Sequence, residues 1–261
     1  MKITILVSTH KPYKMPSDQE LYLPIQVGCD EVAERFGFQG DNTGENISYK
    51  HRYYSDLSAV YWGWKNLDSD VIGSCHYRRY FVSHKAKKGN DPLFRYILSK
   101  EEVENLIEKC PVVVAKKRHY YIETIESHYA HYHNGKDFQL TREIISEICP
   151  EYLEAFNRVA AKRSAHIFNT FIMRKDYLDR FCRFLFPILF KLEKRVDFTG
   201  YDEFESRVCG YMAEFLLDTW ILTENVSYQE VRLALLEKQN WPRKIWKFMV
   251  RKFCPGKRVF R

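Results

Sequence analysis

The sequence of 261 residues lacks most of the features that would define its class at once. It has only 11 Gly and 9 Pro, which excludes collagen-like repeats and long flexible linkers, and its 45% of hydrophobic residues excludes an intrinsically disordered chain. No uninterrupted apolar run reaches about 18 residues, so we expect no membrane-spanning helix. The apolar run Ile3–Val7 is too short and too β-branched for a signal peptide. We therefore expect a folded protein of the cytoplasm.

Recognisable cysteine and metal motifs are also missing. The seven cysteines are scattered singly, without a CxxC pair, and their number is odd. Reduced, mostly buried thiols fit this pattern better than disulfides. His128, His131 and His133 lie close together but have no carboxylate or cysteine partner at a known zinc spacing, so they do not predict a metal site.

Positive charge is concentrated at one end of the chain. Residues 241–261 carry eight basic and no acidic side chains, whereas residues 1–240 carry 33 basic and 34 acidic ones. In this tail Trp241, Ile245 and Phe248 recur at helical spacing, as in helices that lie on anionic membrane surfaces. We expect one domain (1–240) and a basic amphipathic membrane-surface tail (241–261). A helix packed on the domain is the alternative, and no motif supports a nucleic-acid partner.

Hydrophobic periodicity predicts alternating strands and helices. Strands are expected at residues 3–8, 71–75, 111–115 and 165–173, and helices at residues 53–66, 99–110, 176–193 and 201–218. This alternation indicates an α/β fold with helices on both faces of one sheet. Sheets of this kind bind ligands outside the carboxyl ends of their strands.

Three polar clusters lie at predicted strand ends, namely Thr9-His10-Lys11, His76-Tyr77-Arg78-Arg79 and Asn169-Thr170. The middle cluster is the most informative. Two adjacent arginines after a buried strand can present bidentate hydrogen-bond donors to a diphosphate. The alternative is that both arginines are simply solvated at the surface.

Several segments resemble a family of bacterial capsular and exopolysaccharide glycosyltransferases. The likeness is carried mainly by residues 54–66 and 72–81. Residues 9–16, 40–48, 169–173 and 207–214 add to it, and all of these segments occur in matching order along the chain. The resemblance implies a GT-A-like fold, with a mixed, mostly parallel sheet flanked by helices and a helical C-terminal part. It also implies transfer of a hexosyl unit from a UDP-linked sugar to a lipid-linked oligosaccharide at the inner face of the cell membrane. Some relatives are associated with galactofuranose.

The resemblance also bears on metal use. In many GT-A enzymes a helix that begins with Ser-Asp leads into a strand ending in a DxD motif, which holds a divalent metal against the diphosphate. Here Ser55-Asp56 begins the helix, but the next strand ends in His76-Tyr77-Arg78-Arg79. We therefore expect guanidinium and imidazole groups to replace the metal as the counter-charge. The alternative cofactor is Mn²⁺ or Mg²⁺ bound by Asp68 and Asp70, although their place before the strand favours a turn.

Strand ends, helix faces and the resemblance together give candidate residues for each step. Donor binding is expected from Thr9, His10, Lys11, Asn46, Ser48, Asp56, His76, Tyr77, Arg78 and Arg79, and acceptor binding from Tyr129, His133, Asn169 and Arg207. The general base that takes the acceptor hydroxyl proton is expected to be Glu214 or Asp202, with Asp137 as a third candidate. The alternative function is a non-catalytic, membrane-tethered protein that binds a phosphorylated or nucleotide ligand.

Overall fold

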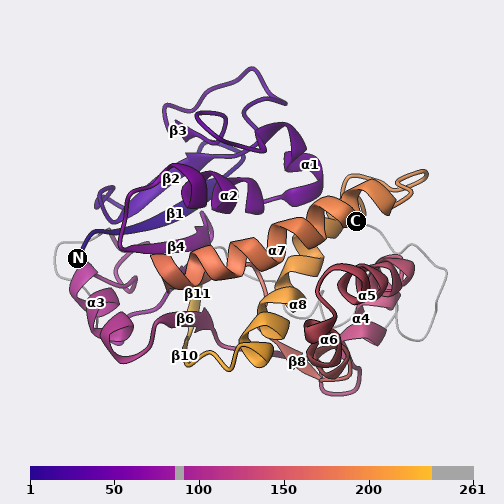
Figure 1. The fold of residues 1–261 in the computed structure, drawn as a ribbon. Coiled ribbons are helices and arrows are strands. Elements are labelled where there is room, and N and C mark those ends of the chain that lie inside the picture. Colours follow the sequence, from indigo (N-terminus) through magenta and orange to yellow (C-terminus); the bar gives the residue numbers. More distant parts are fainter. Residues whose placement is uncertain (86–90, 237–261) are drawn as a thin grey trace.

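The computed structural model describes residues 1–85 and 91–236, and these contain one nine-stranded sheet (Figure 1). Its main path is, in spatial order, β10 (Tyr228–Val231), β6 (Val112–Ala115), β9 (Phe171–Arg174), β4 (Val71–His76), β1 (Ile3–Thr9), β2 (Tyr22–Gln26) and β3 (Gln39–Gly40). Strand β9 is antiparallel to both neighbours, and the other pairs along this path are parallel. The predicted mixed, mostly parallel sheet is confirmed.

Two short strands extend the sheet beyond β4. Strand β5 (Arg79–Phe81) pairs antiparallel with the end of β4, and β11 (Leu233–Leu235) pairs antiparallel with β5. A separate two-stranded ladder joins β7 (Arg118–His119) to β8 (Ser164–Ala165). Short 3-10 helices cover Ser48–Lys50 and Pro150–Tyr152.

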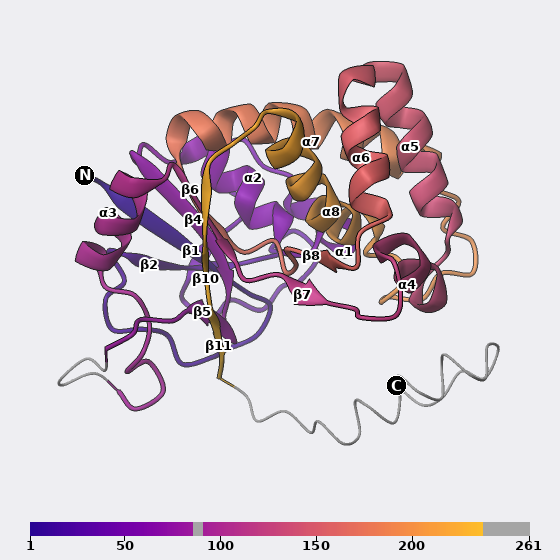
Figure 2. The same cartoon turned by 90° about the horizontal axis from the view of Figure 1, so that it is seen from below.

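Helices cover both faces of the sheet. The α-helices are α1 (His51–Tyr54), α2 (Leu57–Asn66), α3 (Lys100–Lys109), α4 (Ile125–Tyr132), α5 (Lys136–Ile148), α6 (Leu153–Ala160), α7 (Lys175–Arg195) and α8 (Val208–Thr223). One core cluster joins α2, α7 and α8 to one face, and a second joins α3 to the other (Figure 2). Helices α4, α5 and α6 form a lobe packed against α7 and α8.

The central strands are apolar because both of their faces are buried. All seven residues of β1 are buried, and along β6 Val112 and Val114 belong to the α7 and α8 cluster while Val113 belongs to the α3 cluster. Gly73 in β4 lies between β1 and β9, where a β-carbon would come within 3.0 Å of the Ile5 side chain. A side chain at this position would therefore require the Ile5 and Ile172 side chains to shift.

Local sequence signals identify some element ends correctly and miss others. The Ser99 side chain accepts the backbone N–H of Glu102, and the Glu102 carboxylate accepts that of Ser99, which confirms the capping box at the start of α3. The predicted helix 53–66 is wrong in one respect, because it breaks at Ser55 (φ 50°). The predicted strand 165–173 is correct at residues 171–173, which lie in β9, but wrong at residues 166–170, which form a loop between β8 and β9.

The predicted helix 201–218 begins later than expected, at Val208. The preceding residues form turns in which the Asp202 carboxylate accepts the N–H groups of Phe204 and Glu205. No helix in the described part of the chain is long and apolar enough to cross a membrane. The predicted tail 241–261 lies outside the described residues.

Candidate functional site

The three polar clusters meet at the carboxyl edge of the sheet. Ser8 of β1 is in register with His76 of β4, and Ser74 of β4 with Phe171 of β9. Since β9 runs in the opposite direction, the loop that precedes it lies at the same edge as the residues that follow β1 and β4. The site is therefore built from the loop after β1, the turn after β4 and the loop before β9.

The turn between β4 and β5 presents the two arginines. His76 and Arg79 pair across the ladder, so Tyr77 and Arg78 form the two central residues of the turn. The buried Tyr77 ring lies 5.5 Å from the His10 ring, 5.4 Å from Lys11 Nζ and 5.0 Å from Arg78 Cζ. This ring supports the surrounding basic side chains through cation–π contacts.

The imidazole of His76 is neutral. Burial, followed by the charges of Arg79 and Arg78, lowers the pKa of His76 to about 2. Its Nδ1 accepts the backbone N–H of Arg78 at 3.3 Å, which assigns the ring proton to Nε2. His76 can therefore donate a hydrogen bond to an anion but adds no charge. A neutral imidazole leaves Arg78 and Arg79 as the cations of this turn.

Arg79 is a half-buried cation whose guanidinium has no carboxylate partner among the described residues. Its Cζ lies 4.0 Å from the centroid of the Phe168 ring. Among the described residues it makes no hydrogen bond or ion pair, although the charges of Asp56 and Glu214 act on it. Burial lowers the pKa of this guanidinium. A partly desolvated cation without a paired carboxylate is costly, and a bound anion would compensate this cost.

Asp56 lies among these cations because the chain turns sharply before it. Ser55 has φ 50° and ψ −131°, and its carbonyl accepts the Ser58 hydroxyl at 3.2 Å. Gly210 of α8 packs against this turn, where a β-carbon would lie 3.4 Å from the Ser55 side chain. Burial raises the pKa of Asp56, whereas the charges of Arg79 and His51 lower it. The strained turn thus holds a carboxyl group next to Arg79.

Glu214 projects from α8 toward the same edge. Its Oε1 accepts the backbone N–H of Phe168 at 2.9 Å, and within the described residues its Oε2 has no hydrogen-bond partner. Burial raises the pKa of Glu214 to about 7, although the Phe168 hydrogen bond and the charges of Arg79 and Arg118 lower it. A carboxyl group that titrates near neutral pH is suited to accept a proton from a substrate hydroxyl.

The other two candidate bases have structural hydrogen bonds. Asp137 is buried in the helical lobe, where its two oxygens accept the hydroxyls of Tyr129 at 2.8 Å and Tyr201 at 2.9 Å. Asp202 caps the turn that precedes α8 through its Oδ1. Asp137 therefore joins α4, α5 and the segment before α8, and Asp202 fixes the backbone at the start of α8.

The predicted acceptor residues fall into two groups. Tyr129 and His133 belong to an aromatic cluster with Phe204 and Tyr211, in which the His133 ring lies 4.2 Å from that of Tyr211 and 5.1 Å from that of Phe204. Burial raises the pKa of Tyr211 and the charge of Glu214 raises it further, so this cluster adjoins the Glu214 carboxyl group.

The second group, Asn169 and Arg207, makes hydrogen bonds at the start of α8. Arg207 donates to Glu203 at 2.9 Å, and Asn169 donates its side-chain N–H to the Gly210 carbonyl at 2.9 Å. Asn169 thereby fixes the loop before β9 to the helix. Arg207 lies close enough to the site for its charge to act on both His10 and Asp56.

Three residues predicted to bind the nucleotide-sugar donor instead make hydrogen bonds within their own loops. Thr9 Oγ1 donates to the Lys11 carbonyl at 2.6 Å. Ser48 Oγ donates to Asp41 Oδ1 at 2.5 Å, and Asn46 Oδ1 accepts the backbone N–H of Ser48. Their polar side-chain atoms therefore shape the loops after β1 and β3.

A cavity of about 450 Å³ adjoins the site and was not predicted from the sequence. It is lined by Glu31, His51, Arg52, Glu203 and Arg207. The charges of His51 and Arg207 act on both Asp56 and His10. This cavity therefore lies beside the cationic turn, which is formed by residues 76–79. Its volume is in the range of small-molecule sites. Glu31, His51 and Arg52 belong to no motif, so only the tertiary structure identifies them.

The alternative metal ligands lie elsewhere. Asp68 and Asp70 precede β4, whose six residues span about 17 Å from there to the carboxyl edge. Asp70 Oδ2 accepts the Lys2 N–H at 2.7 Å and so joins the starts of β1 and β4. The Glu123 carboxylate contacts His128 at 2.8 Å and His131 at 2.9 Å. In the described part of the chain, no three His, Cys, Asp or Glu side chains are arranged to hold a metal ion.

Comparison with known proteins identifies the fold as that of a glycosyltransferase. The structure is similar to a solved apo structure of the bifunctional glycosyltransferase WbbM, with a TM-score of 0.80 and 26% sequence identity, over 91% of this chain and 46% of that one. This chain thus spans about half the length of that protein. Residues 4–225 match the family described as a domain of unknown function, DUF4422, and the chain belongs to this family. No curated protein matches the sequence.

Proposed function

We propose that this chain is a glycosyltransferase that moves a hexosyl unit from a UDP-linked sugar to a lipid-linked oligosaccharide. The observation that carries the proposal is Arg79, a half-buried guanidinium without an ion-pair partner among the described residues. It lies at the carboxyl edge of the sheet, where α/β folds bind their ligands, and the charges of the Asp56 and Glu214 carboxyl groups act on it. The similarity to a bifunctional glycosyltransferase supports this reading.

In the proposed reaction Glu214 acts as the general base. Its Oε2 accepts the proton of the acceptor hydroxyl while the oxygen of that hydroxyl attacks the anomeric carbon of the donor. The bond between that carbon and the diphosphate oxygen breaks, and its electron pair leaves with UDP. The arginines stabilise the charge that develops on the diphosphate, and His76 donates a hydrogen bond from Nε2.

The counter-charge in this proposal is supplied by Arg78 and Arg79 in place of a metal ion. Arg78 lies in the turn after β4 and Arg79 begins β5, and the buried ring of Tyr77 lies beneath Arg78. Such a fixed arrangement needs little reorganisation when the diphosphate leaves. Transfer is then expected to continue when divalent cations are removed.

The proposed acceptor belongs to capsule, exopolysaccharide or O-antigen synthesis. In the aromatic cluster the exposed ring of Phe204 and the half-buried rings of His133 and Tyr211 offer surfaces near Glu214 on which sugar rings can stack, whereas Tyr129 is buried. A galactofuranosyl group is one candidate for the transferred hexose. We also propose that the basic tail 241–261 holds the protein at the inner face of the cell membrane, which raises the effective concentration of a lipid-linked acceptor.

The first experiment separates donor binding from turnover. A thermal-shift panel of nucleoside diphosphates, each with and without EDTA, should show a higher melting temperature with UDP in both conditions. The Arg79→Met variant should lose this shift. Arg174→Met is the matched control, because Arg174 lies at the opposite end of β9 and pairs with Asp176.

The second experiment measures slow release of free sugar from UDP-hexoses. Release that persists in EDTA and stops in Glu214→Gln supports the proposal. A UDP-induced shift without any sugar release or transfer, with each hexose tested, would instead identify a binding protein. Activity that EDTA abolishes and manganese restores would overturn the metal-free counter-charge.

A further inference from the structure

The loop before β9, residues 166–170, is attached to one face of α8 at three successive turns. His166 donates its backbone N–H to Asp218 Oδ2 at 3.0 Å, and Phe168 donates its own to Glu214 Oε1 at 2.9 Å. The Asn169 side chain donates to the Gly210 carbonyl at 2.9 Å. The acceptors at positions 210, 214 and 218 are spaced by four residues and thus lie on one side of the helix.

The loop backbone needs such support because two of its residues adopt a left-handed conformation. Phe168 has φ 77° and Asn169 has φ 48°, a region that residues with a β-carbon populate at a cost. Neither residue is a glycine. Interactions outside the loop must therefore stabilise this conformation, and the hydrogen bonds to α8 are placed to do so.

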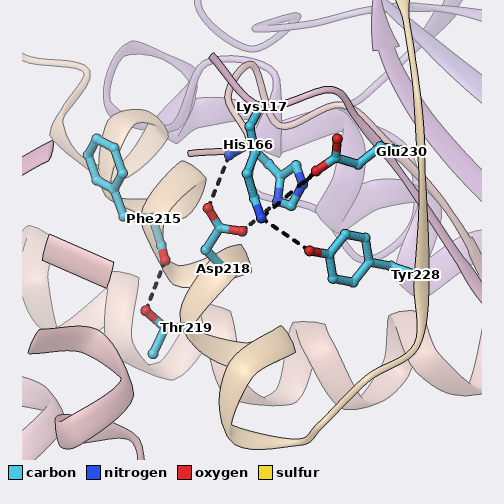
Figure 3. Close-up of polar contacts among 7 residues, drawn as sticks. All are labelled: Lys117, His166, Phe215, Asp218, Thr219, Tyr228 and Glu230. Carbon is cyan, nitrogen blue, oxygen red and sulfur yellow. Dashed lines mark hydrogen bonds and ion pairs between the residues drawn. The ribbon is translucent and has the colours of Figure 1, made fainter. Parts of the chain in front are cut away.

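One of these attachments includes the buried pair of His166 and Asp218, which lies one helical turn beyond Glu214 on α8. His166 is 1% exposed, and its Nδ1 lies 2.5 Å from Asp218 Oδ1 (Figure 3). Asp218 thus binds both the backbone and the ring of His166. The second ring nitrogen, Nε2, lies 3.2 Å from Glu230 Oε1 on β10.

A half-buried lysine and a half-buried tyrosine extend this pair toward the exposed Glu230. Lys117, which follows β6, lies 3.8 Å from Glu230 and 3.1 Å from the Tyr228 hydroxyl. The cluster therefore links the sheet, the loop and α8 through charged hydrogen bonds. His166 is too buried to contact a substrate, so its role must be exerted through the residues that it holds.

We infer that His166 and Asp218 are positioning residues for the Glu214 carboxylate. They fix the loop one helical turn from Glu214, so that the Phe168 N–H holds Oε1 and leaves Oε2 directed to the acceptor hydroxyl. The role as base rests on the function proposed above, whereas the positioning of the loop can be measured independently of it. A displacement of about 1 Å in a catalytic group can lower turnover by about 100-fold.

The test uses Asp218→Asn in the full chain, with Thr219→Val as the matched control. Asparagine keeps the shape of the side chain but replaces one acceptor oxygen by a donor facing His166. Thr219 is the next residue of α8 and is also buried, and its hydroxyl donates to the Phe215 carbonyl of the same helix at 2.9 Å (Figure 3). His166→Gln is the second variant, should Asp218→Asn fail to fold.

Two readouts distinguish positioning from general destabilisation. Amide hydrogen exchange of the loop should become at least about 10-fold faster in Asp218→Asn and stay within about threefold of wild type in Thr219→Val. The kcat for sugar release or transfer should fall about 10- to 100-fold in Asp218→Asn, while the Kd for UDP changes by less than about threefold.

Each outcome decides one claim. Unchanged loop exchange in Asp218→Asn and His166→Gln, or an equal change in Thr219→Val, overturns the positioning role. Faster exchange with unchanged kcat also overturns it. A wild-type chain that releases and transfers no sugar contradicts the proposed function, and the exchange data then still report whether the pair holds the loop.

Discussion

Charged residues of similar kinds lie at the two ends of β4, but they differ in the hydrogen bonds and ion pairs that they make. At the amino end, the carboxylate of Asp70 accepts the Lys2 N–H, and Arg174 of the neighbouring β9 pairs with Asp176. At the carboxyl end, Arg79 has no ion-pair partner among the described residues, although carboxyl groups lie near it. Charged residues at one edge complete the fold, whereas at the other edge Arg79 has no carboxylate partner among the described residues and is the cation to which we assign the proposed ligand.

The same contrast separates two buried carboxyl groups. Burial raises the pKa of both Asp137 and Glu214. Both oxygens of Asp137 accept a tyrosine hydroxyl, whereas Glu214 has only one oxygen engaged within the described residues. A perturbed pKa alone therefore does not identify a functional carboxyl group. An oxygen of that group that accepts no hydrogen bond within the protein is more informative.

The largest expected effect is on turnover in Glu214→Gln. Glutamine can still accept the Phe168 N–H but cannot take a proton, so kcat should fall by about 100- to 10,000-fold with the Kd for UDP little changed. Sugar transfer or release in steady state measures this. The comparison between the two carboxyl groups breaks if Asp137→Asn loses as much activity while remaining equally folded.

The second prediction concerns the pH dependence of stability. The folded-state pKa of Glu214 is about 7, against an ordinary value of 4.5, so the folded protein binds this proton more tightly than the unfolded chain. Its stabilising contribution is complete below pH of about 4.5 and is lost as the pH rises through 7, by on the order of 3 kcal/mol.

Urea unfolding between pH 4.5 and 8.5 tests this prediction. The free energy of unfolding of wild type should fall relative to that of Glu214→Gln over this range. Parallel curves for the two proteins would show that folding does not raise the pKa of the Glu214 carboxyl group. The contrast with Asp137 would then lose its basis.

The third prediction compares arginines at the two edges of the sheet. Arg79→Met should weaken UDP binding by about 10- to 100-fold, because a partly buried cation contributes strongly to the binding of a diphosphate. Arg174→Met should leave the Kd within about twofold. Isothermal titration at two salt concentrations measures both, and equal losses in the two variants would erase the difference between the edges.

The smallest effect is expected at the amino end. Asp70→Asn weakens one exposed hydrogen bond to Lys2 and should lower the free energy of unfolding by about 1 kcal/mol or less. Turnover should not change, either with EDTA or with added manganese. A large loss of activity in Asp70→Asn that manganese corrects would place a metal site at this edge after all.

Sequence alone predicted much of the framework of this molecule. The apolar runs of β1, β4 and β6 are continuous because both faces of these strands are buried, and the Ser99 capping box marks the start of α3 locally. The convergence of Lys11, His76 and Arg79 at one edge follows from the parallel direction of β1 and β4. These features depend on local sequence and strand order.

Tertiary structure decided which polar residues remain available. The sequence offered three candidate bases, and only the folded chain shows that tyrosines occupy Asp137 while Oε2 of Glu214 stays without a partner among the described residues. The buried pair of His166 and Asp218 joins residues 52 positions apart, so no local pattern could reveal it. Hydrogen-bond satisfaction depends on distant neighbours, and a linear sequence does not specify those neighbours until the chain has folded.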